Sequence, residues 1–185
     1  MANIDPSKLI ILDRDGVINQ DSDEYVKTTD EWIPIPGSIE AIADLYKAGF
    51  TICIATNQSG LARGYFSEET LTAMHTKLIS LVEKHGGKIH SIYFCPHGPG
   101  DNCQCRKPLP GMFKQVAEAF RLEDLTNTRT VGDSLRDLDA GNILNCKTYL
   151  VETGKGMRTI DSGKKLPEGT VIFKDLRAFA DSLIG

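Results

Sequence analysis

Long apolar runs are absent from this sequence of 185 residues. No stretch approaches the roughly 18 consecutive apolar residues that a membrane-spanning helix requires. No charged segment followed by an apolar one resembles a secretory leader at its start. We therefore expect a cytoplasmic protein with no membrane partner.

A surplus of basic residues is also absent. The 21 lysines and arginines are outnumbered by 25 aspartates and glutamates, which gives a net charge of −4, and they are scattered along the chain. Proteins that bind a nucleic-acid backbone carry a basic stripe, so nucleic acid is not an expected partner. The GxxxxGK(S/T) motif of P-loop kinases is missing, which disfavours that class of enzyme.

Cysteines are few and unevenly placed. Cys53 and Cys146 stand alone in apolar surroundings, whereas Cys95, Cys103 and Cys105 lie within eleven residues of one another. This pattern indicates two core thiols and a local metal site rather than a disulfide framework.

The clustered cysteines form the pattern Cys95-Pro-His97-x5-Cys103-Gln-Cys105. Cysteine and histidine ligands at such local spacing suit tetrahedral Zn²⁺, and four protein ligands leave no open position for catalysis. We interpret the cluster as a structural zinc site, with a loop of reduced cysteines or an adventitious redox pair as the alternative. Because two basic residues directly follow the last cysteine, bound zinc would fix the loop that carries them.

The hydrophobic content of 41% over 185 residues is enough for one globular core, and we expect a single domain over residues 1–185. Short apolar runs alternate with amphipathic stretches, which is typical of βα units on a parallel sheet with helices on both faces. The predicted fold is a three-layer, doubly wound α/β structure with a mostly parallel, Rossmann-like sheet. Strands are predicted near 8–13, 51–57, 91–95, 128–133, 148–151 and 170–173, and helices over 36–47, 67–86, 110–120, 135–144 and 175–183.

Two long connections are predicted to be loops. Residues 19–36 form a polar connection, and loops of that length in compact domains are often functional. We interpret its aromatic residues, Tyr25 and Trp32, as packing against the sheet edge, with a place in the lining of a site as the alternative. The glycine- and lysine-rich stretch 153–169 is typical of a mobile surface loop.

The stretch LIILDRDGVI, residues 9–18, carries two aspartates at the end of a predicted strand. Residues i and i+2 of an extended chain point to the same side, so Asp13 and Asp15 are predicted to face one point while Arg14 faces away. Two carboxylates at one point repel each other, and a divalent cation such as Mg²⁺ or a shared proton offsets that repulsion. For such a motif taken alone, a solvated turn is the alternative.

Polar residues follow other predicted strands as well. They are the segment TNQSG at 56–60 after the second strand, Lys107 after the third, and GDSLRD at 132–137 after the fourth. In open α/β sheets, ligands bind beyond the carboxyl ends of the strands. A hydroxyl, backbone amides, a fixed cation and several carboxylates at one rim are what phosphoryl transfer through an aspartyl phosphate requires.

The segments DRDGV, TNQSG, RKP and GDSLRD stand in this order at the predicted strand ends. Together they resemble the four motifs of the haloacid dehalogenase (HAD) superfamily of aspartate-nucleophile phosphatases, over residues 9 to about 154. The resemblance implies a HAD fold and hydrolysis through an aspartyl phosphate. The spacing of the motifs leaves no room for a large cap domain.

The resemblance also implies roles for the acidic residues. Asp13 would be the nucleophile. Asp15 would be the general acid that protonates the leaving oxygen, and then the base for the water that hydrolyses the aspartyl phosphate. Mg²⁺ would be held by Asp13, the backbone carbonyl of Asp15 and the carboxylate of Asp133.

Three further motif residues would position the phosphoryl group, namely Thr56, Arg106 and Lys107. Asp137 would support either the metal shell or Lys107. The implied substrate contacts come from the first, second and fourth motif regions, and they are Asn19, Gln20, Asp21, Ser22, Asn57, Gln58, Ser59 and Ser134.

Within this superfamily, zinc-bearing members with a CxH…CxCRKP pattern include heptose bisphosphate phosphatases and histidinol-phosphate phosphatases. The segments TNQSGLARGYF, CRKPLPGM, GDSLRDLDAG and ETGKG resemble the former. This implies a Mg²⁺-dependent enzyme that removes the 7-phosphate of D-glycero-D-manno-heptose 1,7-bisphosphate in lipopolysaccharide precursor synthesis. The five-residue gap between His97 and Cys103 also occurs in histidinol-phosphate phosphatases, which stay the alternative.

The short loops 19–36 and 95–105 would take the place of a cap, shielding the site and selecting a small sugar phosphate, and we expect a monomer. Two other classes of protein stay open. A signalling receiver also accepts phosphate in an acidic pocket with threonine and lysine, although Asp15, two residues after the nucleophile, favours hydrolysis. In a zinc-dependent binding module with a vestigial active site, the two aspartates and Lys107 would be incidental.

Overall fold

The structure, a computed structural model, describes residues 4–185, and a six-stranded parallel sheet runs through its centre in the order β3-β2-β1-β4-β5-β6. The strands are β1 (Leu9–Leu12), β2 (Thr51–Asn57), β3 (Ser91–Cys95), β4 (Arg129–Gly132), β5 (Lys147–Val151) and β6 (Val171–Phe173). The helices are α1 (Ser38–Lys47), α2 (Glu68–Lys84), α3 (Gly111–Ala119), α4 (Leu135–Asn142), α5 (Gly156–Asp161) and α6 (Leu176–Ile184), with a 3-10 turn over Pro6–Lys8.

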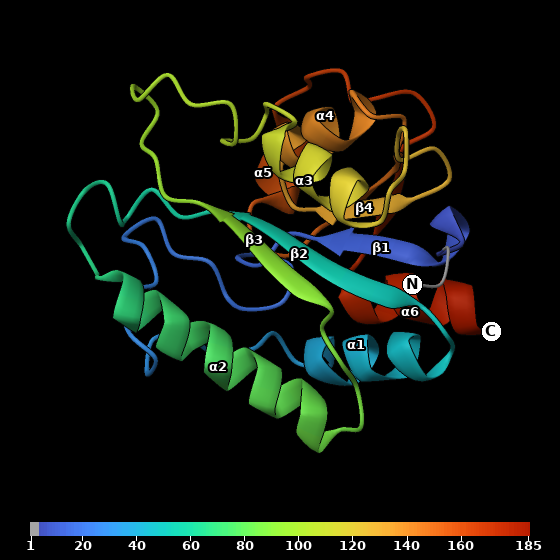
Figure 1. Ribbon diagram of the computed structural model, residues 1–185, viewed down its shortest axis with the longest axis horizontal. Helices are drawn as coiled ribbons and strands as arrows, with labels where there is room; N and C mark the ends of the chain where they lie inside the picture. The colour runs from blue at the N-terminus through green and yellow to red at the C-terminus, as the bar shows by residue number, and fades with distance from the viewer. Residues whose placement is uncertain (1–3) are drawn as a thin grey trace.

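Helices cover both faces of the sheet (Figure 1). α1, α2 and α6 pack on the face to which Ile10 and Leu12 of β1 point, and α3 and α4 pack on the face to which Leu9 and Ile11 point. All four residues of β1 are fully buried, as expected for a central parallel strand that is covered on both sides. The prediction of a three-layer, doubly wound α/β fold is confirmed.

Helix boundaries follow local sequence signals. α2 begins after Ser67, whose hydroxyl oxygen accepts a 3.2 Å hydrogen bond from the amide of Thr70, and α6 begins after Asp175, which accepts one of 2.8 Å from the amide of Ala178. Such side chains satisfy backbone donors that have no partner inside the helix. The five predicted helices are present, each within two residues of its predicted bounds.

The stretch 153–169, predicted to be a loop, contains α5. That prediction was wrong because tertiary contacts rather than an apolar periodicity hold this short helix. A Cβ atom at Gly156 would lie 1.8 Å from the carbonyl oxygen of Val151, so only glycine lets the helix approach the end of β5. The hydroxyl of Thr159 donates a 2.9 Å hydrogen bond to the carbonyl of Asp133, which holds the helix beside the end of β4.

The connection 19–36 is fastened to α2. The Trp32 side chain is fully buried in the core, and the ammonium group of Lys77 donates to the carbonyls of Thr29 at 2.6 Å and Trp32 at 2.8 Å. Tyr25 instead lines the cleft described below. Packing is therefore the role of Trp32, whereas Tyr25 follows the alternative interpretation.

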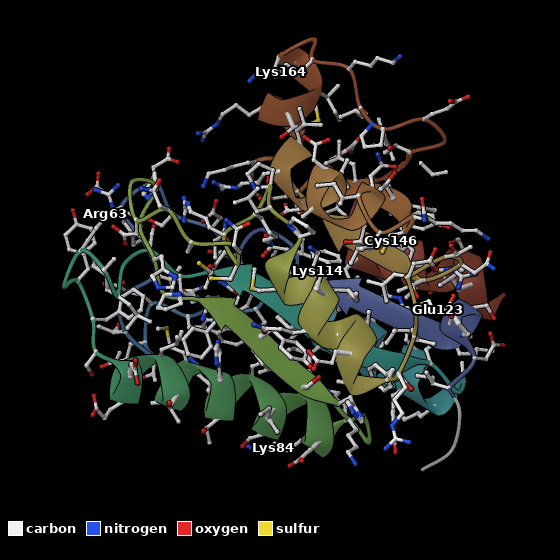
Figure 2. All side chains as sticks on the ribbon, turned by 45° about the horizontal axis from the view of Figure 1, so that its top comes forward. Arg63, Lys84, Lys114, Glu123, Cys146 and Lys164 are labelled. Carbon is white, nitrogen blue, oxygen red and sulfur yellow. The ribbon has the colours of Figure 1, made fainter. Side chains whose placement is uncertain are left out.

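The two isolated cysteines are core thiols, as predicted. Cys53 and Cys146 lie in the apolar cluster on the α3 and α4 side of the sheet, where Figure 2 labels Cys146. Burial raises the pKa of both thiols. Among the helices of residues 4–185, none combines the length and the apolar character that crossing a bilayer would need.

Gly87, three residues after the end of α2, packs tightly against α1, because a Cβ atom there would lie 2.5 Å from the Cα of Ala43. Gly87→Ala is expected to lower the free energy of unfolding by about 1–3 kcal/mol, because the backbone of α1 must move. Urea denaturation measures this loss. The control is Lys88→Ala at the exposed neighbour, with an expected change below about 0.5 kcal/mol. Equal denaturation midpoints for the two variants would contradict the tight contact.

Candidate active site

The crossover helices change sides at β1. The helices that connect β1 to β2 and β2 to β3 lie on one face, and those that follow β3 and β4 lie on the other. In such sheets a crevice opens beyond the carboxyl ends of the strands where the order reverses. A cleft of about 180 Å³ lies there, and its lining includes the predicted residues Asp13, Asp15, Asp21, Ser22, Thr56, Asn57, Gln58, Ser59, Arg106, Lys107, Asp133 and Asp137.

Lys107 is a buried cation in the lining of this cleft. Its Nζ lies 2.9 Å from Oδ1 of Asp13 and 2.6 Å from Oδ1 of Asp137, and it donates a 2.8 Å hydrogen bond to the carbonyl of Ala55. The Lys107 side chain is 2% exposed. Burial alone would lower the pKa of Lys107, but the charges of the two carboxylates outweigh it and raise that pKa. Lys107 is therefore a permanent ammonium group.

The backbone at Lys107 is held by Asn57. The Lys107 amide donates a 3.0 Å hydrogen bond to Oδ1 of Asn57, and Nδ2 of Asn57 donates one of 3.1 Å to the Lys107 carbonyl. Asn57 was predicted as a substrate contact. In the structure its side-chain amide joins the end of β2 to the segment that presents Lys107.

Three carboxylates, those of Asp13, Asp133 and Asp137, have oxygens within 4.8 Å of one another. Burial, followed by the charge of Asp137, raises the pKa of Asp13 to about 6. Burial, followed by the charges of Asp137 and Asp13, raises the pKa of Asp133 to about 9. Lys107 therefore does not balance the cluster, and a hard divalent cation with oxygen ligands fits it.

Asp137 was predicted to support either the metal shell or Lys107, and its ion pair is with Lys107. Burial raises the pKa of Asp137, but the charge of Lys107 outweighs it, so the pKa lies below its usual value. The other carboxylate oxygen accepts a 2.7 Å hydrogen bond from the hydroxyl of Ser134 and one of 3.0 Å from its amide. The bond from the Ser134 amide is one half of a capping box at the start of α4.

Asp15 has a different set of partners. Its Oδ1 accepts hydrogen bonds from Nη2 of Arg14 at 2.9 Å and from Nδ2 of Asn19 at 2.8 Å, and its Oδ2 accepts one from Nε2 of Gln58 at 2.9 Å. Burial raises the pKa of Asp15, but the charge of Arg14 and these hydrogen bonds outweigh it and lower the pKa. Asp15 is ionised in the free protein.

The prediction that Arg14 faces away from the two aspartates was wrong. β1 ends at Leu12, so the alternation of an extended strand stops before Asp13. The chain turns there, and the Arg14 side chain is fully buried against the carboxylate of Asp15.

Three residues predicted as substrate contacts lie outside the lining of the cleft. Asn19 is fully buried beneath Asp15, Gln20 is exposed, and Ser134 caps α4. Thr56 lines the cleft and is 1% exposed, and its hydroxyl accepts a 2.9 Å hydrogen bond from Nε2 of Gln58.

Other residues of the cleft were given no role by the motifs. Nζ of Lys155 lies 2.8 Å from Oδ2 of Asp21, and the Lys155 amide donates a 2.7 Å hydrogen bond to Oδ2 of Asp133. The available signal was the ETGKG segment, which contains Lys155. Further residues that line the cleft and were not predicted as site residues are Asp23, Tyr25, Val26, Phe66 and Arg136.

The four predicted zinc ligands lie together at the end of β3, which is Cys95, and on the loop that follows it. Sγ of Cys95 lies 3.7 Å from Sγ of Cys103, 3.0 Å from Sγ of Cys105 and 3.6 Å from Nδ1 of His97. A tetrahedron with Zn–S distances of about 2.3 Å has edges of about 3.8 Å, so the set is close to the size of a zinc site. All five cysteines are free thiols. Nη1 of Arg106 donates a 3.4 Å hydrogen bond to the carbonyl of His97, which ties the cluster to the cleft.

Comparison with known proteins identifies the family. The HAD-hydrolase-like family model matches residues 104–179. A D-glycero-β-D-manno-heptose-1,7-bisphosphate 7-phosphatase from Pseudomonas aeruginosa is 57% identical over 176 residues, which cover 95% of this chain and 97% of that protein. The chain belongs to the heptose-1,7-bisphosphate 7-phosphatase family of HAD-like hydrolases.

Solved structures of heptose bisphosphate phosphatases share the fold. The enzyme from Bordetella bronchiseptica, crystallised with magnesium and phosphate, is 53% identical and has a TM-score of 0.93, with 96% of this chain and 98% of that chain covered. A heptose bisphosphate phosphatase from Burkholderia thailandensis is 45% identical, with a TM-score of 0.75 and coverage of 96% and 99%. A haloacid dehalogenase from Xanthobacter autotrophicus, 11% identical with a TM-score of 0.62, shares the fold alone.

Lys107→Met is expected to lower the free energy of unfolding in magnesium-free buffer by about 3–5 kcal/mol, because Asp13 and Asp137 stay buried without their cation. Urea denaturation measures the loss. Adding Asp137→Asn removes one unpaired charge, so the double variant should be more stable than the two single losses predict.

The control for the lost lysine is Lys114→Met on the exposed surface of α3 (Figure 2). A Lys107→Met protein as stable as this control would show that the ion pairs contribute nothing.

Proposed function

We propose that this protein is a Mg²⁺-dependent phosphatase that removes the 7-phosphate of D-glycero-β-D-manno-heptose 1,7-bisphosphate, a step in lipopolysaccharide precursor synthesis. The observation that carries the proposal is the meeting of Asp13, Asp15 and Lys107 in one polar cleft. The names of the relatives support the substrate and its β anomer. The small polar cleft suits a small sugar phosphate, and the proposal includes a monomeric, cytoplasmic enzyme.

Asp13 acts as the nucleophile in this proposal. A carboxylate oxygen of Asp13 attacks phosphorus, and the bond between phosphorus and the sugar oxygen breaks. Lys107, fixed 2.9 Å from Asp13, stays close to the phosphoryl oxygens and balances their charge. Thr56 and Arg106 line the same cleft and orient the group.

Asp15 handles the proton. Its pKa is low in the free protein, and the negative charge of a bound phosphate raises it, because like charges favour the protonated form. With phosphate bound, Asp15 is protonated, and it gives its proton to the departing sugar oxygen. It then takes a proton from the water that attacks phosphorus, and the bond to Asp13 breaks to release inorganic phosphate.

The residues of the cleft fit a magnesium ion. Asp13, Asp133 and the backbone carbonyl of Asp15 would hold it. Burial, and then the charges of Asp137 and Asp13, raise the pKa of Asp133, and a bound cation would offset these effects. When bound, Mg²⁺ supplies charge that favours the ionised form of Asp13 and neutralises phosphoryl oxygens. The relative from B. bronchiseptica was crystallised with magnesium and phosphate, which supports this choice of metal.

Asp15→Asn is expected to lower kcat for heptose 1,7-bisphosphate by about 10²–10⁴-fold, because a positioned acid contributes that much. Phosphate release in the presence of Mg²⁺ measures the loss. Asp30→Asn, on the exposed part of the 19–36 connection, is the matched control and should turn over normally. Unchanged turnover in Asp15→Asn would show that Asp15 is not the general acid.

The same assay separates the alternatives with wild-type protein. Faster hydrolysis of histidinol phosphate than of either heptose 1,7-bisphosphate anomer would show that histidinol phosphate, and not the heptose bisphosphate, is the substrate. A stable acyl phosphate on Asp13, seen by mass spectrometry, would indicate a receiver. Phosphatase activity that does not change when magnesium is removed would contradict the proposed requirement for Mg²⁺.

We further propose that Cys95, His97, Cys103 and Cys105 bind a structural zinc ion. The close approach of their ligand atoms supports four-coordinate binding with no open position. The zinc fixes the 95–105 loop, and Arg106 and Lys107 follow it directly. Zinc thus acts on the reaction through the placement of these two cations.

Cys103→Ser is expected to lose the zinc and to lower the Tm by about 10 °C, since metal binding contributes to folding. Inductively coupled plasma mass spectrometry measures the number of zinc ions per chain, and differential scanning calorimetry measures the Tm. Cys53→Ala, which changes a cysteine outside the four-residue ligand group, should keep one zinc per chain. Wild-type protein that purifies without zinc and resists chelators with an unchanged Tm would refute the site.

A further inference from the structure

Arg14, which lies between Asp13 and Asp15 in the sequence, has a fully buried side chain. Its guanidinium grips the carboxylate of Asp15, with Nε at 3.1 Å and Nη2 at 2.9 Å from Oδ1 and Nη2 at 3.2 Å from Oδ2. Such a fork fixes the plane of a carboxylate as well as its position. Lysine offers a point charge and would not fix that plane. Arg14 thus determines how the Asp15 carboxylate is oriented.

The remaining arm of Arg14 meets His75 of α2. Nε2 of His75 lies 3.3 Å from Nη1 of Arg14, and the His75 side chain is buried. Burial, and then the charge of Arg14, lowers the pKa of His75 to about 4. The imidazole is therefore neutral at physiological pH, and Nε2 accepts the hydrogen bond from the guanidinium.

α2 is a rigid support for this contact. Met74 and Leu78, on either side of His75, are fully buried in the core, and Lys77 fastens the 19–36 connection to the same helix. These contacts anchor His75, and through it the orientation of Arg14, to the hydrophobic core. Asn19 and Gln58 donate to the two oxygens of Asp15 from other directions.

We propose that His75 and Arg14 are positioning residues that aim the carboxylate of Asp15 at the oxygen of the departing alcohol. The inference rests on the proposed function, in which Asp15 is the general acid. Neither residue transfers a proton or lines the cleft. Loss of the His75 acceptor lets the guanidinium turn, so the carboxylate is misdirected and proton delivery slows while phosphate binding persists.

This role makes the effect depend on the leaving group. A sugar alkoxide is a poor leaving group and needs the proton, whereas p-nitrophenolate departs without one. kcat/KM reports the steps up to the departure of the leaving group, so the later attack of water does not enter. A smaller fraction of correctly folded enzyme would lower kcat/KM equally for the sugar ester and the aryl ester.

The experiment compares His75→Leu with His75→Gln on heptose 1,7-bisphosphate and on p-nitrophenyl phosphate. His75→Leu should lower kcat/KM for the sugar ester about tenfold, a part of what a positioned acid contributes, and for the aryl ester less than about twofold. The amide oxygen of His75→Gln can accept from Arg14, so it should restore most of the loss. Asp15→Asn should show the same asymmetry on a larger scale.

Equal losses on the two esters, no loss on the sugar ester, or no recovery in His75→Gln would each overturn the proposal. If His75→Leu does not fold, Arg14→Lys takes its place and should show the same asymmetry, because it keeps the charge but loses the fork. If the wild type does not hydrolyse heptose bisphosphate, the proposed substrate fails. The comparison is then made with any alkyl phosphate that the wild type hydrolyses, so the two failures are distinct.

Discussion

The ammonium group of Lys107, held between Asp13 and Asp137 with 2% of the side chain exposed, is the interaction on which the site depends. A buried charge is costly unless it is paired and hydrogen-bonded. Lys107 meets that condition with two carboxylates and the carbonyl of Ala55. Because a third carboxylate, Asp133, has no share in this pairing, the cluster keeps an excess of negative charge that suits a divalent cation.

Much of the surrounding structure keeps Lys107 in place. Asn57 clasps its backbone from the end of β2, the cap of α4 fixes Asp137, and the loop with the four zinc-ligand candidates ends directly before the Arg106–Lys107 pair. These supports come from the end of β2, the start of α4 and the loop that follows β3. In our proposal this loop acts on the chemistry through the position of a cation, without contributing a group to the reaction.

Asp13 and Asp15 differ by environment rather than by type. Asp13 lies among carboxylates and faces Lys107, whereas Asp15 is surrounded by the donors of Arg14, Asn19 and Gln58. Those donors hold the carboxylate of Asp15 in one orientation and keep it ionised in the free protein. In the proposed mechanism, the division between a nucleophile and a proton carrier thus depends on neighbours that lie from one residue away, as Arg14 does from Asp15, to 94 residues away, as Lys107 does from Asp13.

The sequence by itself determined the sheet, its helices and the gathering of Asp13, Thr56, Lys107 and Asp133, because apolar periodicity locates strands and the carboxyl ends of parallel strands share one edge. It did not determine where side chains turn after a strand ends. Arg14 folds onto Asp15, Asn57 holds a backbone and α5 brings Lys155 to the cleft. Only the tertiary structure decided these contacts, because no periodicity in the sequence specifies the direction of a side chain outside the strands and helices or its partner in another segment.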